Sequence, residues 1–136
     1  MQSQVVVRTS RQIEALDMTD IVLAQELPDG LVLVSLPHTT AALLLSEADA
    51  DLLVDFEKVA SGWATGFEPF RHHKNDNPNA AAHLLSALAG SQVIIPVEGG
   101  KAQLGQFQRL VLLELDGPKE RHVRLHALGS ASVVQP

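Results

Sequence analysis

Residues 31–36 read Leu31-Val32-Leu33-Val34-Ser35-Leu36, a six-residue apolar run broken by one serine. Because side chains alternate between the two faces of a strand, a run that is apolar on both faces is typical of a central strand covered on both sides. The preceding Pro28-Asp29-Gly30 favours a turn, since proline fixes one backbone dihedral and glycine tolerates a positive one. Pro37 ends the strand, and His38-Thr39-Thr40 follows at its end.

Strands and helices are expected on both sides of this run. Further strands are predicted at 5–9, 12–18, 41–45, 92–97, 108–115 and 122–128, and helices from Thr19, from Ser46 or Asp49, and from Asn79 to Ala89. Glu98-Gly99-Gly100-Lys101 predicts a hairpin turn, and 116–119 a second turn. Strands joined largely by hairpin turns, with helices interspersed, predict an α+β fold with a mainly antiparallel β-sheet or sandwich core and about three helices.

Helical spacing predicts which residues face the core. In the second helix the apolar positions with this spacing are Leu52, Phe56, Val59 and Trp63, with Leu53 and Ala60, and in the first they are Ile21, Val22, Ala24 and Leu27. The 107–115 strand alternates, which places Gln108, Leu110, Leu112 and Glu114 on one face.

Length and composition limit the class of protein. The 136 residues suit one domain over 1–136, and the absence of cysteine excludes disulfides, thiolate zinc sites and thiol nucleophiles. The formal charge of −6 argues against a nucleic-acid partner. Val5-Val6-Val7 is strand-like and too short to cross a bilayer, so we expect no membrane partner and a cytoplasmic location.

The longest irregular stretch leads into the third helix. Pro69 to Leu88 carries three of the six histidines, and Asn77-Pro78 opens a turn after which Asn79 is expected to act as the N-cap. His83 then lies about one turn into the helix, where the helix dipole suits an anion or a metal-bound anion. A polar surface loop followed by a surface helix is the simpler interpretation of these residues alone.

Histidines are the candidate metal ligands. His38, one of His72 and His73, and His83 can supply three imidazoles to a divalent metal and leave one position open. His72 and His73 would point to opposite sides of an extended loop, so one of them at most can join the site. The spacing matches no metal motif, and a lone His38 is more often a hydrogen-bonded structural histidine.

Two carboxylates stand out. Glu114 lies between leucines on a strand expected to be covered, where a carboxylate is costly unless it is paired or used. An equally good interpretation is that this face of the strand is open to solvent near the strand end, where Glu114 would be hydrated. Glu47 is the second candidate, and Gln108 shares the face of Glu114. The alternating polar stripe His122, Arg124 and His126 favours a solvated or interface face.

Several segments together resemble the YjbQ family, whose members are often called secondary thiamine-phosphate synthases. The segments are Leu36-Pro-His-Thr-Thr-Ala-Ala-Leu43, Phe70-Arg-His72, Asn79 to His83-Leu84, Ser91-Gln-Val-Ile-Ile-Pro-Val97, Gly100, Leu104-Gly105, Phe107-Gln108 and Glu114-Leu-Asp-Gly-Pro118. The likeness runs from Val5 to Gly129 in the family's order and spacing.

The resemblance implies a homotrimer with its site at subunit interfaces. It implies that His38, His72 and His83 bind a divalent metal, zinc or magnesium, or an anion, and that the partner is a small phosphorylated molecule. Thr39, Thr40, Asn79 and Gln108 would bind substrate, and Glu47 and Glu114 would be catalytic. The implied secondary activity is a transferase reaction that joins a pyrimidine pyrophosphate to a thiazole phosphate.

The chain departs from the family pattern at four positions. Ser46 stands where Asn usually precedes the glutamate, and Phe70 stands where Tyr is common. Phe107 replaces the Trp before the glutamine, and Ala81 replaces a polar residue or a further histidine. Two alternatives to a transferase therefore stand: a metal-dependent hydrolase of a small phosphorylated compound, and a non-catalytic small-ligand-binding trimer.

Overall fold

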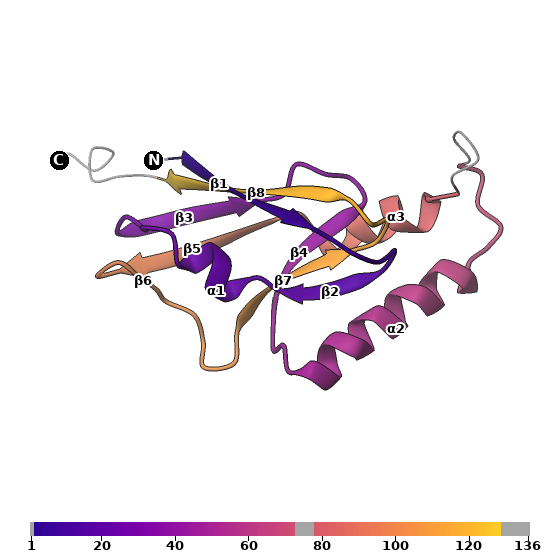
Figure 1. Cartoon of the computed structure of the whole chain (residues 1–136), viewed down its shortest axis with the longest axis horizontal. Helices are drawn as coiled ribbons and strands as arrows, with labels where there is room; N and C mark the ends of the chain where they lie inside the picture. The colour runs from indigo at the N-terminus through magenta and orange to yellow at the C-terminus, as the bar shows by residue number, and fades with distance from the viewer. Residues whose placement is uncertain (1, 73–77, 129–136) are drawn as a thin grey trace.

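The computed structural model describes residues 2–72 and 78–128, which form two sheets and three helices. The elements in chain order are β1 (Gln2–Arg8), β2 (Glu14–Asp17), α1 (Thr19–Leu23), β3 (Gly30–Ser35), β4 (Ala41–Ser46), α2 (Ala50–Gly66), α3 (Ala80–Ala89), β5 (Gln92–Glu98), β6 (Lys101–Ala102), β7 (Arg109–Glu114) and β8 (Glu120–Leu128) (Figure 1).

All strand pairs in the described ranges are antiparallel. The larger sheet has the order β1-β8-β3-β5-β6, and the smaller one has the order β2-β7-β4. The β5–β6 hairpin turns at Gly99 and Gly100, whose φ values of 62° and 75° lie in the left-handed region. The predicted α+β fold with a mainly antiparallel core and about three helices is confirmed.

The main core lies between the two sheets. It is built from side chains that alternate inward along the strands of both sheets, together with α1. Its most enclosed members, each at most 2% exposed, are Met18, Val22, Val32, Val34, Leu36, Ala41, Leu43, Ile95, Leu110, Leu112, Val123 and Leu125. The opposite face of the small sheet carries Ala42, Val111 and Leu113, which pack against α2 and α3.

The two long helices cover the small sheet, and the outer side of the large sheet has no helix on it in the described residues. α2 contacts β2 and α3 contacts β4 (Figure 1). The expectation that residues 31–36 are covered on both faces is therefore half right. Val32 and Val34 are at most 1% exposed, but Leu31 on the other face is 45% exposed.

Two helical faces differ from the sequence prediction. Val59, predicted inward, is 67% exposed, and Ile21 is 55% exposed. In α2 the residues packed against the small sheet are Leu53, Phe56 and Ala60, three of the six predicted positions, and Val59 lies outside this stripe. Ala60, 2% exposed, is small enough to let the helix lie close to the sheet.

Candidate functional site

His38 lies just beyond the end of β3, an inner strand of the large sheet. Its side chain extends the hydrogen bonding between β3 and β8. Its Nε2 accepts a hydrogen bond of 2.9 Å from the backbone N–H of His122 in β8, and the two rings stack with centroids 5.8 Å apart. β3 ends at Ser35, opposite Arg124, so this donor has no strand partner on that side. An accepting Nε2 leaves the proton of the neutral ring on Nδ1.

The surroundings of His38 favour its neutral form. Partial burial and the nearby Arg121 guanidinium lower the pKa of His38, with smaller contributions from His122 and Arg124, while Glu114 opposes them. A charged imidazolium could not accept the hydrogen bond from His122.

The stability of the fold is therefore expected to depend on pH through His38. The unfolded chain binds a proton at this ring near pH 6.5, whereas the folded chain binds it at lower pH. The stabilisation is complete above pH 6.5 and is lost as the pH falls through the folded pKa. A histidine titration followed by NMR, with denaturant melts across the same range, tests this. A folded pKa of His38 at or above that of a model peptide would contradict it.

His72 and His83 are neighbours across the turn that enters α3. Their ring centroids are 5.0 Å apart with the rings edge to face, and the backbone N–H of His83 donates to the carbonyl of Asn79, which places His83 in the first turn as predicted. His72 is exposed and His83 half-buried. His73, its alternative, lies outside the described residues.

Two cavities adjoin at His83. One, here called the Arg71 cavity, has a volume of about 280 Å³ and is lined by Phe70, Arg71, His72, Ala80, His83 and Leu84. The other, here called the His38 cavity, has a volume of about 370 Å³ and is lined by His38, Thr39, His83, Ser86, Ala87, Gly90 and Ser91. The three predicted histidines therefore line one continuous surface beside α3.

A third cavity extends this surface past His72. Its volume is about 410 Å³, and its lining includes Phe70 and Ala80 of the Arg71 cavity together with Pro69, Pro78 and Glu68. The ring of Phe70 and the two prolines give this end an apolar wall, next to a single described carboxylate.

The described residues do not assemble a three-ligand metal site. No group of three His, Cys, Asp or Glu side chains within 2–72 and 78–128 is placed to hold a metal ion. The lone pair of His38 Nε2 is engaged by the backbone of β8, whereas the rings of His72 and His83 are neighbours with centroids 5.0 Å apart. The zinc or magnesium site stays a prediction.

Glu114 is enclosed in a network of hydrogen bonds rather than open to a ligand. It is 0% exposed, and its Oε1 accepts from Arg121 Nε and from the Thr9 hydroxyl, each at 2.8 Å. Its Oε2 accepts from the backbone N–H groups of Leu115 and Asp116. Burial alone would raise the pKa of Glu114, but these hydrogen bonds outweigh it and lower the pKa. The geometry favours a structural role for this carboxylate.

Arg121 links the Glu114 carboxylate to residues 36–40, the segment between β3 and β4 that carries His38 and is here called the histidine loop. Its guanidinium, 3% exposed, donates to the carbonyl and the hydroxyl of Thr40 at 3.0 and 2.9 Å. Thr40 is thus turned inward, and of the two threonines only Thr39 lines the His38 cavity.

Asn79 occupies the N-cap position of α3 as predicted, but its side chain makes no capping hydrogen bond. Its Nδ2 donates to Asp116 at 3.0 Å, and its Oδ1 is buried without a partner in the described residues. Burial alone would raise the pKa of Asp116, but hydrogen bonds from Lys119 and Asn79 lower it. The oxygen Oδ1 is the atom with which an asparagine accepts from helix N–H groups, so the hydrogen bond from Nδ2 to Asp116 does not replace the missing cap.

Glu47 and Gln108 lie at the far end of the small sheet. β4 pairs Ala41 with Glu114 and Ser46 with Arg109, so Glu47 is separated from the His38 end by the length of the strand, about 20 Å. Gln108 closes its own loop by accepting from the backbone of Gly105 at 2.8 Å. A single copy of the chain does not bring either residue to His83.

Sequence reasoning missed two arginines of this region. Arg71 was quoted only as part of a motif, although it is one of just ten Lys and Arg residues and precedes His72 directly. Arg121 is in phase with the inward-facing Val123 and Leu125 of β8, a signal that a charged residue faces the core. Such a residue needs a buried partner, and Glu114 provides it.

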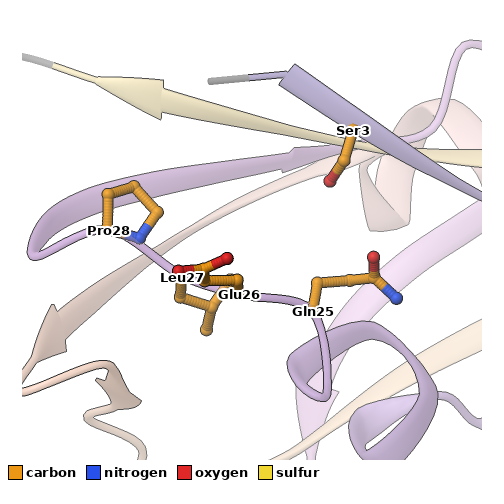
Figure 2. Close-up of a pocket in the computed structure, with 5 residues that line it drawn as sticks. All are labelled: Ser3, Gln25, Glu26, Leu27 and Pro28. Carbon is orange, nitrogen blue, oxygen red and sulfur yellow. The ribbon is translucent and has the colours of Figure 1, made fainter.

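Another large cavity lies away from the histidines. It has a volume of about 420 Å³ and lies between β1 and the segment after α1, where it is lined by Ser3, Gln25, Glu26, Leu27 and Pro28 (Figure 2). The Ser3 hydroxyl has no partner in the described residues. No predicted site residue reaches this cavity.

The fold and most of the length of the chain match proteins of one family. A family model described as UPF0047 protein YjbQ-like matches residues 3–130. A UPF0047 protein of Archaeoglobus fulgidus is 40% identical and covers 92% of this chain and 99% of its own length. The UPF0047 protein YugU of Bacillus subtilis is 31% identical, with 90% and 96% covered.

Solved structures give the same result. A hypothetical protein of Aeropyrum pernix superposes with a TM-score of 0.84 at 35% identity and covers 96% of this chain and 99% of its own. A YbjQ-like protein of unknown function from Sulfolobus solfataricus has a TM-score of 0.81 at 32% identity, with 92% and 94% covered. The chain is thus an α+β protein of this two-sheet type. It belongs to the YjbQ-like UPF0047 family.

The length and apolarity of a helix decide whether it can cross a membrane. Within residues 2–72 and 78–128, no helix is both long enough and apolar enough to cross a bilayer.

Proposed function

We propose that the chain binds a small phosphorylated molecule at the two cavities that adjoin at His83. The observation that carries this proposal is the chemistry of their lining. The described lining of both cavities includes one guanidinium, three imidazoles, a threonine and two serines, but no carboxylate. The chain as a whole has 16 acidic and 10 basic residues, so this local selection of donors favours an anion.

Arg71 and the histidines would each contribute to binding. Arg71 presents a fixed fork of donors that suits a phosphate. His83 lies between the cavities and can donate from its ring to an anion in either one, and the first turn of α3 adds the positive end of a ten-residue helix. Phe70 and Leu84 give the Arg71 cavity an apolar wall for the rest of the ligand.

The same donors would suit the transferase reaction that the family resemblance implies. When a pyrimidine pyrophosphate reacts with a thiazole phosphate, the bond from carbon to the pyrophosphate oxygen breaks and a carbon–nitrogen bond forms. Negative charge develops on the departing pyrophosphate. Preorganised cations and N–H donors at that position lower the barrier. A binding protein without turnover is the second candidate, because Glu114 is enclosed and Glu47 lies far from the cavities of the same copy.

Binding is tested by titrating the chain with inorganic phosphate and pyrophosphate under NMR observation. His83→Ala and Arg71→Ala are each expected to weaken binding about ten- to a hundredfold, since a hydrogen bond to a charged group contributes roughly 1.5 to 3 kcal/mol. Lys58→Ala removes an exposed cation of α2 that lines neither cavity, so it should change the affinity less than twofold. Equal losses in all three variants, or no saturable binding, would refute the site.

Catalysis requires a separate measurement on the same proteins. Wild type is incubated with both thiamine-phosphate precursors, with and without added divalent metal, and the product is quantified. Formation above background that falls in His83→Ala supports the transferase. Phosphate binding without product under either condition supports the binding protein.

A further inference from the structure

The cavity between β1 and the segment after α1 has no part in the proposed phosphate site. We call it the Ser3 cavity, and its described lining is Ser3, Gln25, Glu26, Leu27 and Pro28 (Figure 2). Its volume of about 420 Å³ is far above the roughly 30 Å³ that one water occupies in the liquid. The Ser3 cavity therefore has room for a molecule of several non-hydrogen atoms.

The polar groups that line the Ser3 cavity offer oxygen acceptors of three kinds. The hydroxyl of Ser3 is buried and has no hydrogen-bond partner in the described residues, although a buried hydroxyl normally has one. Figure 2 shows this hydroxyl directed from β1 toward the segment that carries Gln25 and Glu26. The Gln25 amide uses its Nε2 in a long contact of 3.5 Å with the carbonyl of Ile21, which leaves its Oε1 as an acceptor. The Glu26 carboxylate adds two acceptor oxygens and no donor.

The charge around the Ser3 cavity is negative. Glu26 is the one charged residue of its described lining, and four of the five lining residues come from a stretch without any lysine or arginine, between Arg11 and Lys58. Arg124 of the neighbouring strand β8 contacts Gln4, which alternation places on the opposite face of β1 from Ser3. With a net charge of −6 on the whole chain, the Ser3 cavity attracts a cation and repels an anion.

We infer that the Ser3 cavity binds a primary alkylammonium ion. An ammonium group has three N–H donors and no acceptor, so it fits a site that offers hydroxyl, amide and carboxylate oxygens. The Ser3 hydroxyl reaches its ligand by turning between the staggered positions of its side chain, and it gains the hydrogen bond that the empty chain leaves unmade. Leu27 and Pro28 give the alkyl chain an apolar surface.

The probe for this site is butylammonium, followed through the backbone amide resonances of the chain at low salt. Saturable shifts are expected at Ser3 and at residues 25–27. 1-Butanol has the same number of non-hydrogen atoms without the charge and should bind more weakly, and butyrate, which carries the opposite charge, should not bind. Methylammonium should also bind more weakly than butylammonium, by up to about fourfold for each methylene that it lacks.

Two substitutions in the lining and one outside it test the assignment. Glu26→Gln keeps the shape of the side chain, removes its charge and should weaken butylammonium binding about tenfold, and Ser3→Ala should weaken it about fivefold. Asp55→Asn removes an exposed carboxylate of α2 that is not in the described lining, so it should change the affinity less than twofold. Ser3→Ala should keep the urea midpoint of the wild type, because its hydroxyl has no partner to lose.

Four results would each overturn the inference: equal affinities for 1-butanol and butylammonium, an unchanged affinity in Glu26→Gln, an equal loss in Asp55→Asn, or shifts spread over all surface carboxylates. The last of these would mean that the amine only screens the negative charge of the chain. None of these measurements involves Arg71 or His83. The outcome is therefore independent of the phosphate titration.

Discussion

The Arg121→Met variant is expected to unfold with a free energy about 3 to 5 kcal/mol below that of the wild-type chain, because it leaves a buried carboxylate without its cation. Glu114 is 0% exposed and cannot reach water when Arg121 is removed. Methionine fills most of the volume of the arginine stem, so the loss reports the charge rather than a cavity. Urea melts at neutral pH measure the difference.

An exposed ion pair of the same sheet provides the matched control. The Nη2 atom of Arg8 lies 3.3 Å from Oε2 of Glu120, and the two side chains are 81% and 44% exposed. Arg8→Met should therefore cost less than about 1 kcal/mol. A second test combines Glu114→Gln with Arg121→Met in one double variant. This removes both charges and should recover part of the free energy of unfolding that Arg121→Met loses. A double variant as unstable as the sum of the single ones would show that the two groups act independently.

This ion pair also explains how the histidine loop is held. Glu114 belongs to β7 of the small sheet and Arg121 to β8 of the large one, so their contact joins the two layers. Arg121 then holds both polar groups of Thr40, two residues after His38. We therefore expect Arg121→Met to loosen the loop as well as the fold.

The sequence predicted the fold well where local patterns carried the information. Alternation placed Leu110, Leu112 and Glu114 on one face of β7, and the structure confirms that this face looks into the main core. Asp49, one of two predicted caps of α2, accepts from the backbone N–H of Leu52 at 2.9 Å. Both features depend on residues close in sequence, where spacing determines contact.

The candidate site was harder to predict because it depends on contacts between distant segments. Nothing near Asn79 in sequence shows that its Nδ2 donates to Asp116, and nothing near His38 shows that the backbone N–H of His122 donates to its ring nitrogen. The pairing of Arg121 with Glu114 was visible only as two charged residues on inward-facing positions. Periodicity predicts the face on which a side chain lies, but not its partner.

Gly117→Ala is expected to lower the free energy of unfolding by about 3 kcal/mol or more, a steric effect at the upper end of what overpacking costs. An added Cβ would overlap the carbonyl oxygen of Arg11 and lie 2.8 Å from Glu114 Cγ and 2.9 Å from Thr9 Oγ1. The first is a backbone atom and cannot turn aside. The other two belong to the buried network, so the strain reaches the ion pair.

Gly62→Ala separates this steric effect from the general effect of replacing glycine. Gly62 lies within α2 and a Cβ there has no atom within 4 Å, so alanine should stabilise the chain by about 0.5 to 1 kcal/mol through its better helix propensity. The two substitutions add the same methyl group and should shift the urea midpoint in opposite directions. If Gly117→Ala melted like wild type, the 116–119 turn would be able to move away from Arg11 without cost, and the tight packing of the two sheets at Glu114 would not limit this part of the fold.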